Sequence, residues 1–205
     1  MTTPRTRARN KRGEGAQLRD EIVGAATKLL EDGTPENVTL RGIARQAGIS
    51  APSIYAHFPD LDSILLAVAQ RAFGVLEQEL GAADDEDPAQ RLRAICAAYL
   101  TFAERRPHQY RVMFGAVWDA GQARDRAPGM ADELAALGMG AFEILRRTLA
   151  DCVASGRSTS ADPFRDATAL WVGLHGFAQL QVAAPLFPWP PELRGTVIDR
   201  MALLR

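Results

Sequence analysis

Residues 38–58 have the sequence VTLRGIARQAGISAPSIYAHF, which contains the clearest structural pattern in the chain. Apolar residues recur at i, i+3, i+4 and i+7 from Leu40, which is the spacing of one buried helical face. We expect Thr39 to cap this helix, Gly48 to form the turn after it, and Ser50 to cap a shorter helix over 51–57. Two short helices joined by a tight glycine-containing turn are typical of a helix-turn-helix.

The outward side of the second helix carries an unusual set of side chains for a solvated face. An apolar inner face leaves Ala51, Ser53, Tyr55 and His57 pointing outward. Small, hydroxyl-bearing and aromatic groups fit a DNA groove or meet phosphate oxygens better than a Lys/Glu mixture does. The segment is therefore predicted to contact DNA.

The rest of the chain is predicted to be helical as well, because no sustained period-2 alternation appears. We expect an all-α protein with a flexible basic arm (1–16), a helix-turn-helix DNA-binding domain (17–60) and a larger helical domain (61–205). Other helices are expected at 17–30, 61–80 (the linking helix), 88–104, 108–117, 130–154, 163–186 and 191–204.

Composition and charge narrow the class of protein. The chain has 205 residues, 47% of them hydrophobic, which excludes collagen-like and fully disordered classes. No apolar run reaches the ~18 residues of a membrane span and no secretory signal appears, so we expect a soluble cytoplasmic protein without a membrane partner. The net charge is −1, yet residues 1–19 carry about +5. This arm fits either a polyanion-binding segment or a solubilising tail.

Signatures of catalysis and metal binding are missing from the sequence. We find no G-x-S-x-G, no P-loop and no C-x-x-C, and the two cysteines are expected to be core residues. His57, His108 and His175 lie in separate segments without ligand-like spacing. We therefore expect neither an enzyme, nor a metal site, nor a cofactor. The competing hypotheses are a helical interaction adaptor and an enzyme that does not bind DNA.

The segment Val38–Phe58 resembles the DNA-binding signature of the tetracycline-repressor (TetR) family of bacterial transcriptional regulators. The residues that carry the resemblance are Thr39, Ile43-Ala44, Ala47-Gly48, Ser50, Tyr55 and His57-Phe58. A shorter stretch, WVGLHG at 171–176, is similar to the W…HG motif of one regulatory-domain subgroup. The resemblance implies a homodimer that binds a palindromic double-stranded DNA operator and responds to a small-molecule effector. It also implies that 61–205 is the regulatory ligand-binding and dimerisation domain. It also implies a repressor that the effector releases.

The resemblance also implies which residues contact DNA. These are Thr39, Arg41, Ser50, Ala51, Pro52, Ser53, Tyr55 and His57. Tyr55 and His57 would clamp phosphates, and Arg41 is either a direct reader of guanine or an exposed helix charge. Family members often have a Lys just after the His-Phe pair, whereas this chain has Pro59, Asp60, Leu61 and Asp62, so we expect the basic arm to compensate.

Two further sets of residues are expected in the C-terminal part. Aromatic and Met side chains form either an apolar effector cavity or a plain packed core; they are Tyr99, Phe102, Tyr110, Met113, Phe114, Trp118, Phe142, Trp171 and His175. His175 is an effector ligand, a satisfied core histidine, or part of a packing motif with Gly173 and Gly176. The dimer interface implied by the resemblance contains Leu174, Leu180, Ala183, Ala184, Val197, Met201 and Leu204.

Overall fold

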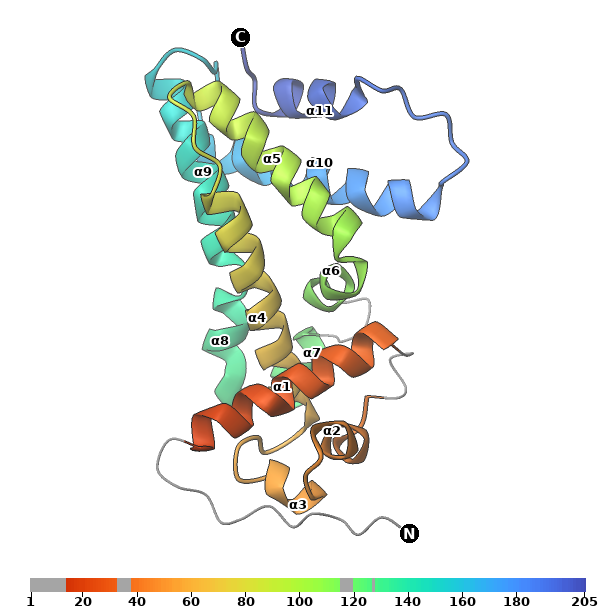
Figure 1. Ribbon diagram of the computed structural model, residues 1–205. Helices are drawn as coiled ribbons and strands as arrows, with labels where there is room; N and C mark the ends of the chain where they lie inside the picture. Colours follow the sequence, from red (N-terminus) through yellow and green to blue (C-terminus); the bar gives the residue numbers. More distant parts are fainter. Residues whose placement is uncertain (1–13, 33–37, 115–119, 127) are drawn as a thin grey trace.

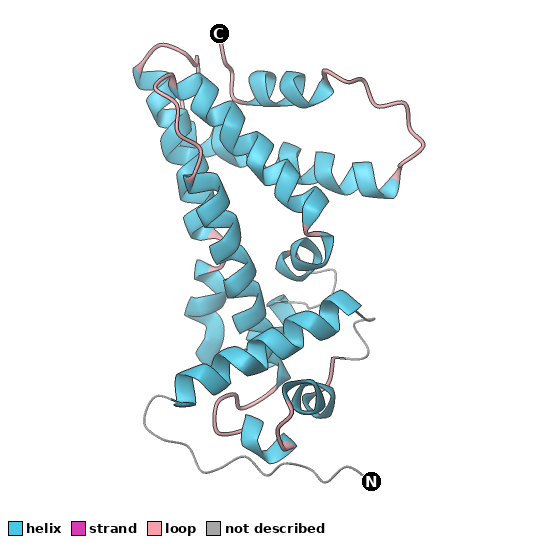
Figure 2. Cartoon of the chain, viewed as in Figure 1, coloured by secondary structure: helices cyan, strands magenta, loops and turns pink. Residues whose placement is uncertain are grey.

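The computed structural model describes residues 14–32, 38–114, 120–126 and 128–205. All named elements in these ranges are helices, with one isolated bridge between Ser158 and Leu204 (Figure 2). The predicted all-α fold is confirmed. The predicted arm at 1–16 lies almost wholly outside the described residues, as does Trp118.

The N-terminal unit contains α1 (Glu14–Asp32), α2 (Leu40–Ala47) and α3 (Ala51–Ile54), which gather at one end of the molecule (Figure 1). The Thr39 hydroxyl accepts a hydrogen bond from the Gly42 amide at 3.1 Å and caps α2, as expected. Gly48 ends α2 at φ 67°, a left-handed conformation that glycine adopts without steric cost.

The predicted cap and length of the third helix were wrong. Ser50 makes no capping bond to the backbone; its hydroxyl lies 2.7 Å from that of Ser53. The α-helix ends at Ile54, because Ile54 and Phe58 are drawn inward and the chain turns over 55–57 to bury Phe58.

Helix α4 (Leu61–Gly81) connects this unit to the rest of the protein (Figure 1). It begins with a capping box: the Ser63 amide donates to the Asp60 carboxylate at 2.8 Å, and the Asp60 amide donates to the Ser63 hydroxyl. Its 21 residues span about 32 Å at 1.5 Å per residue. The acidic residues after Phe58 thus start a helix that reaches both halves of the molecule.

The C-terminal part packs helices around α4. They are α5 (Pro88–Arg105), α6 (Pro107–Met113), α7 (Ala120–Arg126), η2 (Pro128–Met130), α8 (Ala131–Ala136), α9 (Met139–Ala154), α10 (Pro163–Ala183) and α11 (Leu193–Met201). Helix α7 was not expected from the sequence. Helices α10 and α11 lie at the end of the molecule opposite α3, joined by a proline-rich loop (Figure 1).

The single helix predicted over 130–154 is broken. Its first turns form η2 and α8, and α9 starts at Met139, because Gly138 takes φ 78°. A β-carbon at Gly138 would lie 2.7 Å from Cε1 of Phe73 in α4. The break therefore coincides with a close approach of the α8–α9 junction to α4.

Two apolar clusters hold the helices together. The cluster around Ile22, Ile43 and Ile54 joins α1–α3 to the first half of α4 and also includes Val112 and Ala123. The larger one joins the second half of α4 to α5, α6, α9, α10 and α11, and it buries both cysteines. Leu137 packs against both clusters. Within the described ranges, no helix is long and apolar enough to cross a bilayer.

Candidate functional site

The helix-turn-helix presents an exposed face made of the predicted DNA-contacting residues. Thr39, Arg41, Ser50, Pro52 and Tyr55 are exposed, whereas Ala51, Ser53 and His57 are half-buried. Tyr55 retains 59% of its surface although it is a large aromatic residue. The polar edge of the unit is therefore accessible in one copy of the chain.

Five residues of this set have partners inside the protein, and two of them, Ser50 and Ser53, contact each other through their hydroxyl groups at 2.7 Å. Ala51 packs against the apolar cluster of the N-terminal unit, which leaves less of its methyl group for a base edge. The Thr39 hydroxyl already caps α2. The His57 ring lies at the start of α1, since a β-carbon at Gly15 would be 3.9 Å from its Cε1 atom.

The charge near this face is less acidic than the carboxylates of Asp60 and Asp62 alone suggest. Asp62, in the first turn of α4, accepts two hydrogen bonds from the Arg126 guanidinium at 2.8 and 2.9 Å. This bidentate pair offsets one of the acidic charges that replace the usual Lys. Arg41 and Arg45 are exposed on α2, and the Arg19 guanidinium lies 4.6 Å from the Phe58 ring centre.

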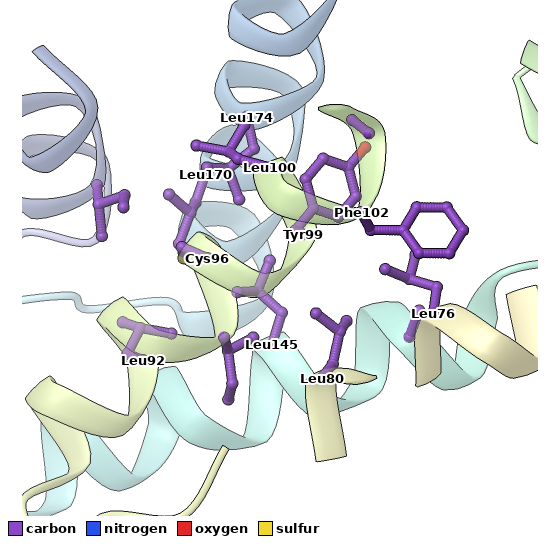
Figure 3. Close-up of a cluster of buried hydrophobic side chains, with 14 of the residues drawn as sticks. Leu76, Leu80, Leu92, Cys96, Tyr99, Leu100, Phe102, Leu145, Leu170 and Leu174 are labelled. Atoms are coloured by element: carbon purple, nitrogen blue, oxygen red, sulfur yellow. The ribbon is translucent and has the colours of Figure 1, made fainter. Parts of the chain in front are cut away.

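A cavity of about 380 Å³ lies among the C-terminal helices and α4. Side chains from α4, α5, α9 and α10 line it, among them Leu76, Tyr99, Leu145 and Leu174. Figure 3 shows these four side chains within the buried apolar cluster of the C-terminal part. Phe164 and Met139 line the cavity and are more than half exposed, so the cavity reaches the surface beside them. Its volume falls in the ordinary range for small-molecule sites.

The structure brings five of the nine predicted ligand-binding residues to this cavity: Tyr99, Met113, Phe114, Phe142 and Trp171. Phe102 is fully buried in the core away from the cavity. Tyr110 and His175 stand behind Tyr99, outside the lining.

Most of the other residues that line the cavity were not predicted from the sequence. Phe73 and Leu76 on α4 and Leu134, Leu137 and Gly138 at the α8–α9 junction also line the cavity. Helical spacing identifies such residues as buried, but it does not separate those that face a cavity from those that face another helix. No further signal in the sequence distinguishes them.

Three polar side chains form a connected group next to the cavity. The Tyr110 hydroxyl lies 2.7 Å from His175 Nδ1 and 3.0 Å from the Tyr99 hydroxyl. Burial raises the pKa of Tyr99 to about 12, an effect that hydrogen bonds with Tyr110 and Trp171 oppose. Burial also raises the pKa of Tyr110 and lowers the pKa of His175. The group is therefore uncharged at neutral pH.

The predicted dimer residues divide between the core and the surface. Leu174 is buried and lines the cavity, so it does not belong to an exposed face. Leu180, Ala183 and Met201 are exposed, whereas Ala184, Val197 and Leu204 are half-buried. Other large apolar side chains are exposed nearby, on α10 and in the loop to α11: Val172, Val182, Leu186 and Phe187.

The two glycines of the W…HG region behave differently. Gly173 admits the Met201 side chain of α11, since a β-carbon there would collide with its sulfur atom. A β-carbon at Gly176 would meet nothing within 4 Å. The described residues contain no group of three or more His, Cys, Asp or Glu that could hold a metal ion.

Comparison with known proteins agrees with this geometry. Residues 22–68 match the family described as "Bacterial regulatory proteins, tetR family", and residues 92–203 match "Tetracyclin repressor-like, C-terminal domain". The nucleoid occlusion factor SlmA of Aliivibrio fischeri (strain MJ11) is 29% identical over 102 residues, which are 47% of this chain and 51% of SlmA. The chain thus spans about half the length of the curated relatives it matches.

Solved structures resemble the whole chain. A protein of unknown function from Rhodococcus sp. RHA1 is 25% identical with a TM-score of 0.75 and full coverage of both chains. A tetR-family regulatory protein from Rhodococcus RHA1 shares the fold at 18% identity and a TM-score of 0.64, over 91% of this chain and 95% of its own. The C-terminal family match covers more than half of the chain. The helix-turn-helix, the helical C-terminal part and these matches together establish that the chain belongs to the tetR family of bacterial regulatory proteins.

Proposed function

We propose that this regulator is a cytoplasmic homodimeric repressor that binds a palindromic operator and is released by a small, mostly apolar effector bound in the cavity. The observation that carries the proposal is the position of Leu134 and Leu137. Both line the cavity and both pack against the apolar cluster of the helix-turn-helix unit. A ligand that displaces them therefore acts directly on the core that orients α2 and α3.

The DNA contacts would come from the exposed edge of α2 and α3. Tyr55 and Ser50 present hydroxyl groups suited to phosphate oxygens, and the exposed Arg41 suits a guanine edge or a phosphate. The half-buried His57, next to α1, presents an imidazole beside them. Thr39 and Ser53 would contribute at the rim, while Ala51 and Pro52 offer only apolar contacts.

Dimerisation would use the exposed apolar side chains of α10 and α11. Regulators of this family bind DNA and act as dimers. An exposed apolar stripe on α10, including Leu180 and Ala183, continues onto Met201 of α11, and burial of such a patch drives association. A two-fold pair can place its recognition helices about 34 Å apart, one turn of DNA. We expect Val197 and Leu204 at the edge of this interface.

Regulation would follow from linkage between the two sites. An effector weakens DNA binding only by as much as it prefers the conformation that does not fit DNA. Two routes join the cavity to the DNA-binding unit. One runs through Leu134 and Leu137 of the α8–α9 junction. The other runs through α6, which bears the cavity residue Met113 and packs against α1 and α4.

The proposal is tested with a Tyr55→Ala variant and DNA selected from a random duplex pool by the wild-type protein. We expect the variant to lose specific binding while remaining dimeric, because Tyr55 is exposed and contributes little to the core. Tyr55→Phe is the matched control: it keeps the ring, so any loss reports the hydroxyl alone. Unchanged DNA affinity of Tyr55→Ala, measured by fluorescence anisotropy with sedimentation as the check on dimerisation, would contradict the proposed DNA contact surface.

A further inference from the structure

The wall of the cavity contains no ionic group in the part of the chain that the structure describes. Its lining consists of apolar side chains together with Tyr99, Trp171, Thr168 and Cys96. The Thr168 hydroxyl is already engaged, donating to the Phe164 carbonyl at 2.8 Å. A charged ligand group would lose its hydration here without meeting an opposite charge, which is costly. The wall therefore selects against ions.

Tyr99 connects the wall of the cavity to the polar group Tyr99–Tyr110–His175. Of these three residues only Tyr99 lines the cavity. Its hydroxyl lies 3.0 Å from the Tyr110 hydroxyl and 3.5 Å from His175 Nδ1, and the Tyr110 hydroxyl lies 2.7 Å from the same Nδ1 atom, so the shorter contacts run from Tyr99 through Tyr110 to His175. The His175 ring stacks on Tyr110 with 24° between the planes and lies 4.5 Å from the centre of Phe114. Tyr110 and His175 thus hold Tyr99 in place.

A neutral histidine allows two proton arrangements along this chain of hydrogen bonds. When Nδ1 lacks a proton, Tyr110 donates to it, Tyr99 donates to Tyr110, and the Tyr99 oxygen accepts from a ligand. When Nδ1 carries the proton, both hydroxyls reverse and Tyr99 donates to the ligand. A ligand hydroxyl, which both donates and accepts, fits either arrangement.

The volume limits the size of the ligand. A cavity of about 380 Å³ lies near the lower end of the roughly 300–1,000 Å³ range of small-molecule sites, so we expect a small ligand.

We infer that the cavity binds a small, uncharged, mostly hydrocarbon alcohol, and that its hydroxyl group hydrogen-bonds to Tyr99, which Tyr110 and His175 hold in position. Tyr99 contacts the ligand and determines specificity. Tyr110 and His175 are positioning residues. This inference rests on the effector site proposed above and names the chemistry of that site.

The test uses three probes of similar shape: 4-phenylbutan-1-ol, pentylbenzene and 4-phenylbutanoate. Binding to the full-length protein without DNA is followed by tryptophan fluorescence and calorimetry. We expect the alcohol and the hydrocarbon to bind, and 4-phenylbutanoate to bind at least about 100-fold more weakly than the alcohol, since no cation meets its carboxylate. Equal affinity for the alcohol and the carboxylate, or no binding of any probe, would overturn the inference.

A substitution at Tyr99 tests whether its hydroxyl group binds the ligand. Tyr99→Phe keeps the ring and should weaken binding of the alcohol about fivefold, the fold-change that corresponds to about 1 kcal/mol for one neutral hydrogen bond. Its affinity for pentylbenzene, which has no polar group, should stay within about twofold, and this serves as the control for an intact cavity. Equal effects on both probes would refute the role of the Tyr99 hydroxyl.

The role of His175 needs a readout that a purely structural residue does not move. His175→Phe keeps a stacked ring but removes Nδ1, so it should lower the affinity for the alcohol and leave the affinity for pentylbenzene unchanged. His175→Gln restores a hydrogen-bonding group beside Tyr110 and should recover alcohol binding. Loss of both probes in His175→Phe, or no loss of either, would contradict the positioning role.

The same experiment separates this inference from the proposed regulation. If the alcohol binds through Tyr99 but leaves the affinity for selected DNA unchanged, the release mechanism is wrong and the ligand class stands. If 4-phenylbutanoate binds and releases DNA, the ligand class is wrong and the release mechanism stands.

Discussion

The junction between α8 and α9 offers a sharp test of the packing around the cavity. Gly138 has φ 78°, and a β-carbon there would lie 2.7 Å from Cε1 and 3.0 Å from Cζ of Phe73. Phe73 is 8% exposed, packs edge-on against Phe114 at 5.7 Å and lines the cavity, so the added methyl group must push its ring out of this contact toward the cavity. Gly138→Ala is therefore expected to cost about 1–2 kcal/mol for the left-handed backbone and about 1–3 kcal/mol for the collision.

Gly156→Ala is the matched control for this substitution. Gly156 has φ 72°, but a β-carbon there meets nothing within 4 Å, so only the backbone cost of about 1–2 kcal/mol applies. Urea unfolding at one fixed protein concentration, which keeps any dimer contribution constant, measures both free energies. We expect Gly138→Ala to be the more destabilising variant by about 1–3 kcal/mol.

A second variant tests the assignment of this difference to Phe73. Phe73→Leu removes the ring atoms nearest to the added methyl group, so Gly138→Ala should cost less in that background than in the wild type. Equal costs of Gly138→Ala and Gly156→Ala in the wild type, or no relief by Phe73→Leu, would refute the reasoning.

Two further predictions concern association and pH. Leu180→Glu places a charge on the exposed stripe of α10 and should yield a monomer in sedimentation. The control Gln90→Glu, at an exposed position of α5, should leave the dimer intact, and a dimeric Leu180→Glu variant would show that this stripe is not part of the interface. Burial lowers the pKa of His175 below its ordinary 6.5. Below pH 6.5 the unfolded chain therefore binds a proton at His175 more readily than the folded chain does, and the free energy of unfolding falls by at most about 1.4 kcal/mol per pH unit. Unfolding free energies of wild type and His175→Gln, compared from pH 7.5 to pH 5, should converge as the pH falls, and parallel curves would contradict the assignment.

The helix-turn-helix could be predicted from the sequence because its determinants are local. The Thr39 cap, the apolar spacing of α2 and the left-handed Gly48 depend on neighbours within a few residues. The buried Ile54 and Phe58 and the exposed Tyr55 follow from the same spacing. The short range of these interactions also explains why this segment carried the family resemblance.

The effector site could be predicted only in part, because helical spacing shows that a face is buried but not what it faces. Helix α10 is apolar on two sides, and only packing assigned Leu174 to the cavity and Leu180 to the surface. Phe102 and Tyr99 are both buried aromatics of α5, yet only Tyr99 reaches the cavity.

Contacts between distant segments were beyond the reach of the sequence. Asp62 and Arg126 are 64 residues apart, and the hydrogen bond that joins Tyr110 to His175 spans 65. The all-α fold, the DNA-binding unit and the family resemblance could be predicted because they rest on local periodicity and capping. The apolar side chains that enclose a cavity, those that stay exposed and the contacts between the two parts depend on which helix faces pack together, so only the three-dimensional arrangement reveals them.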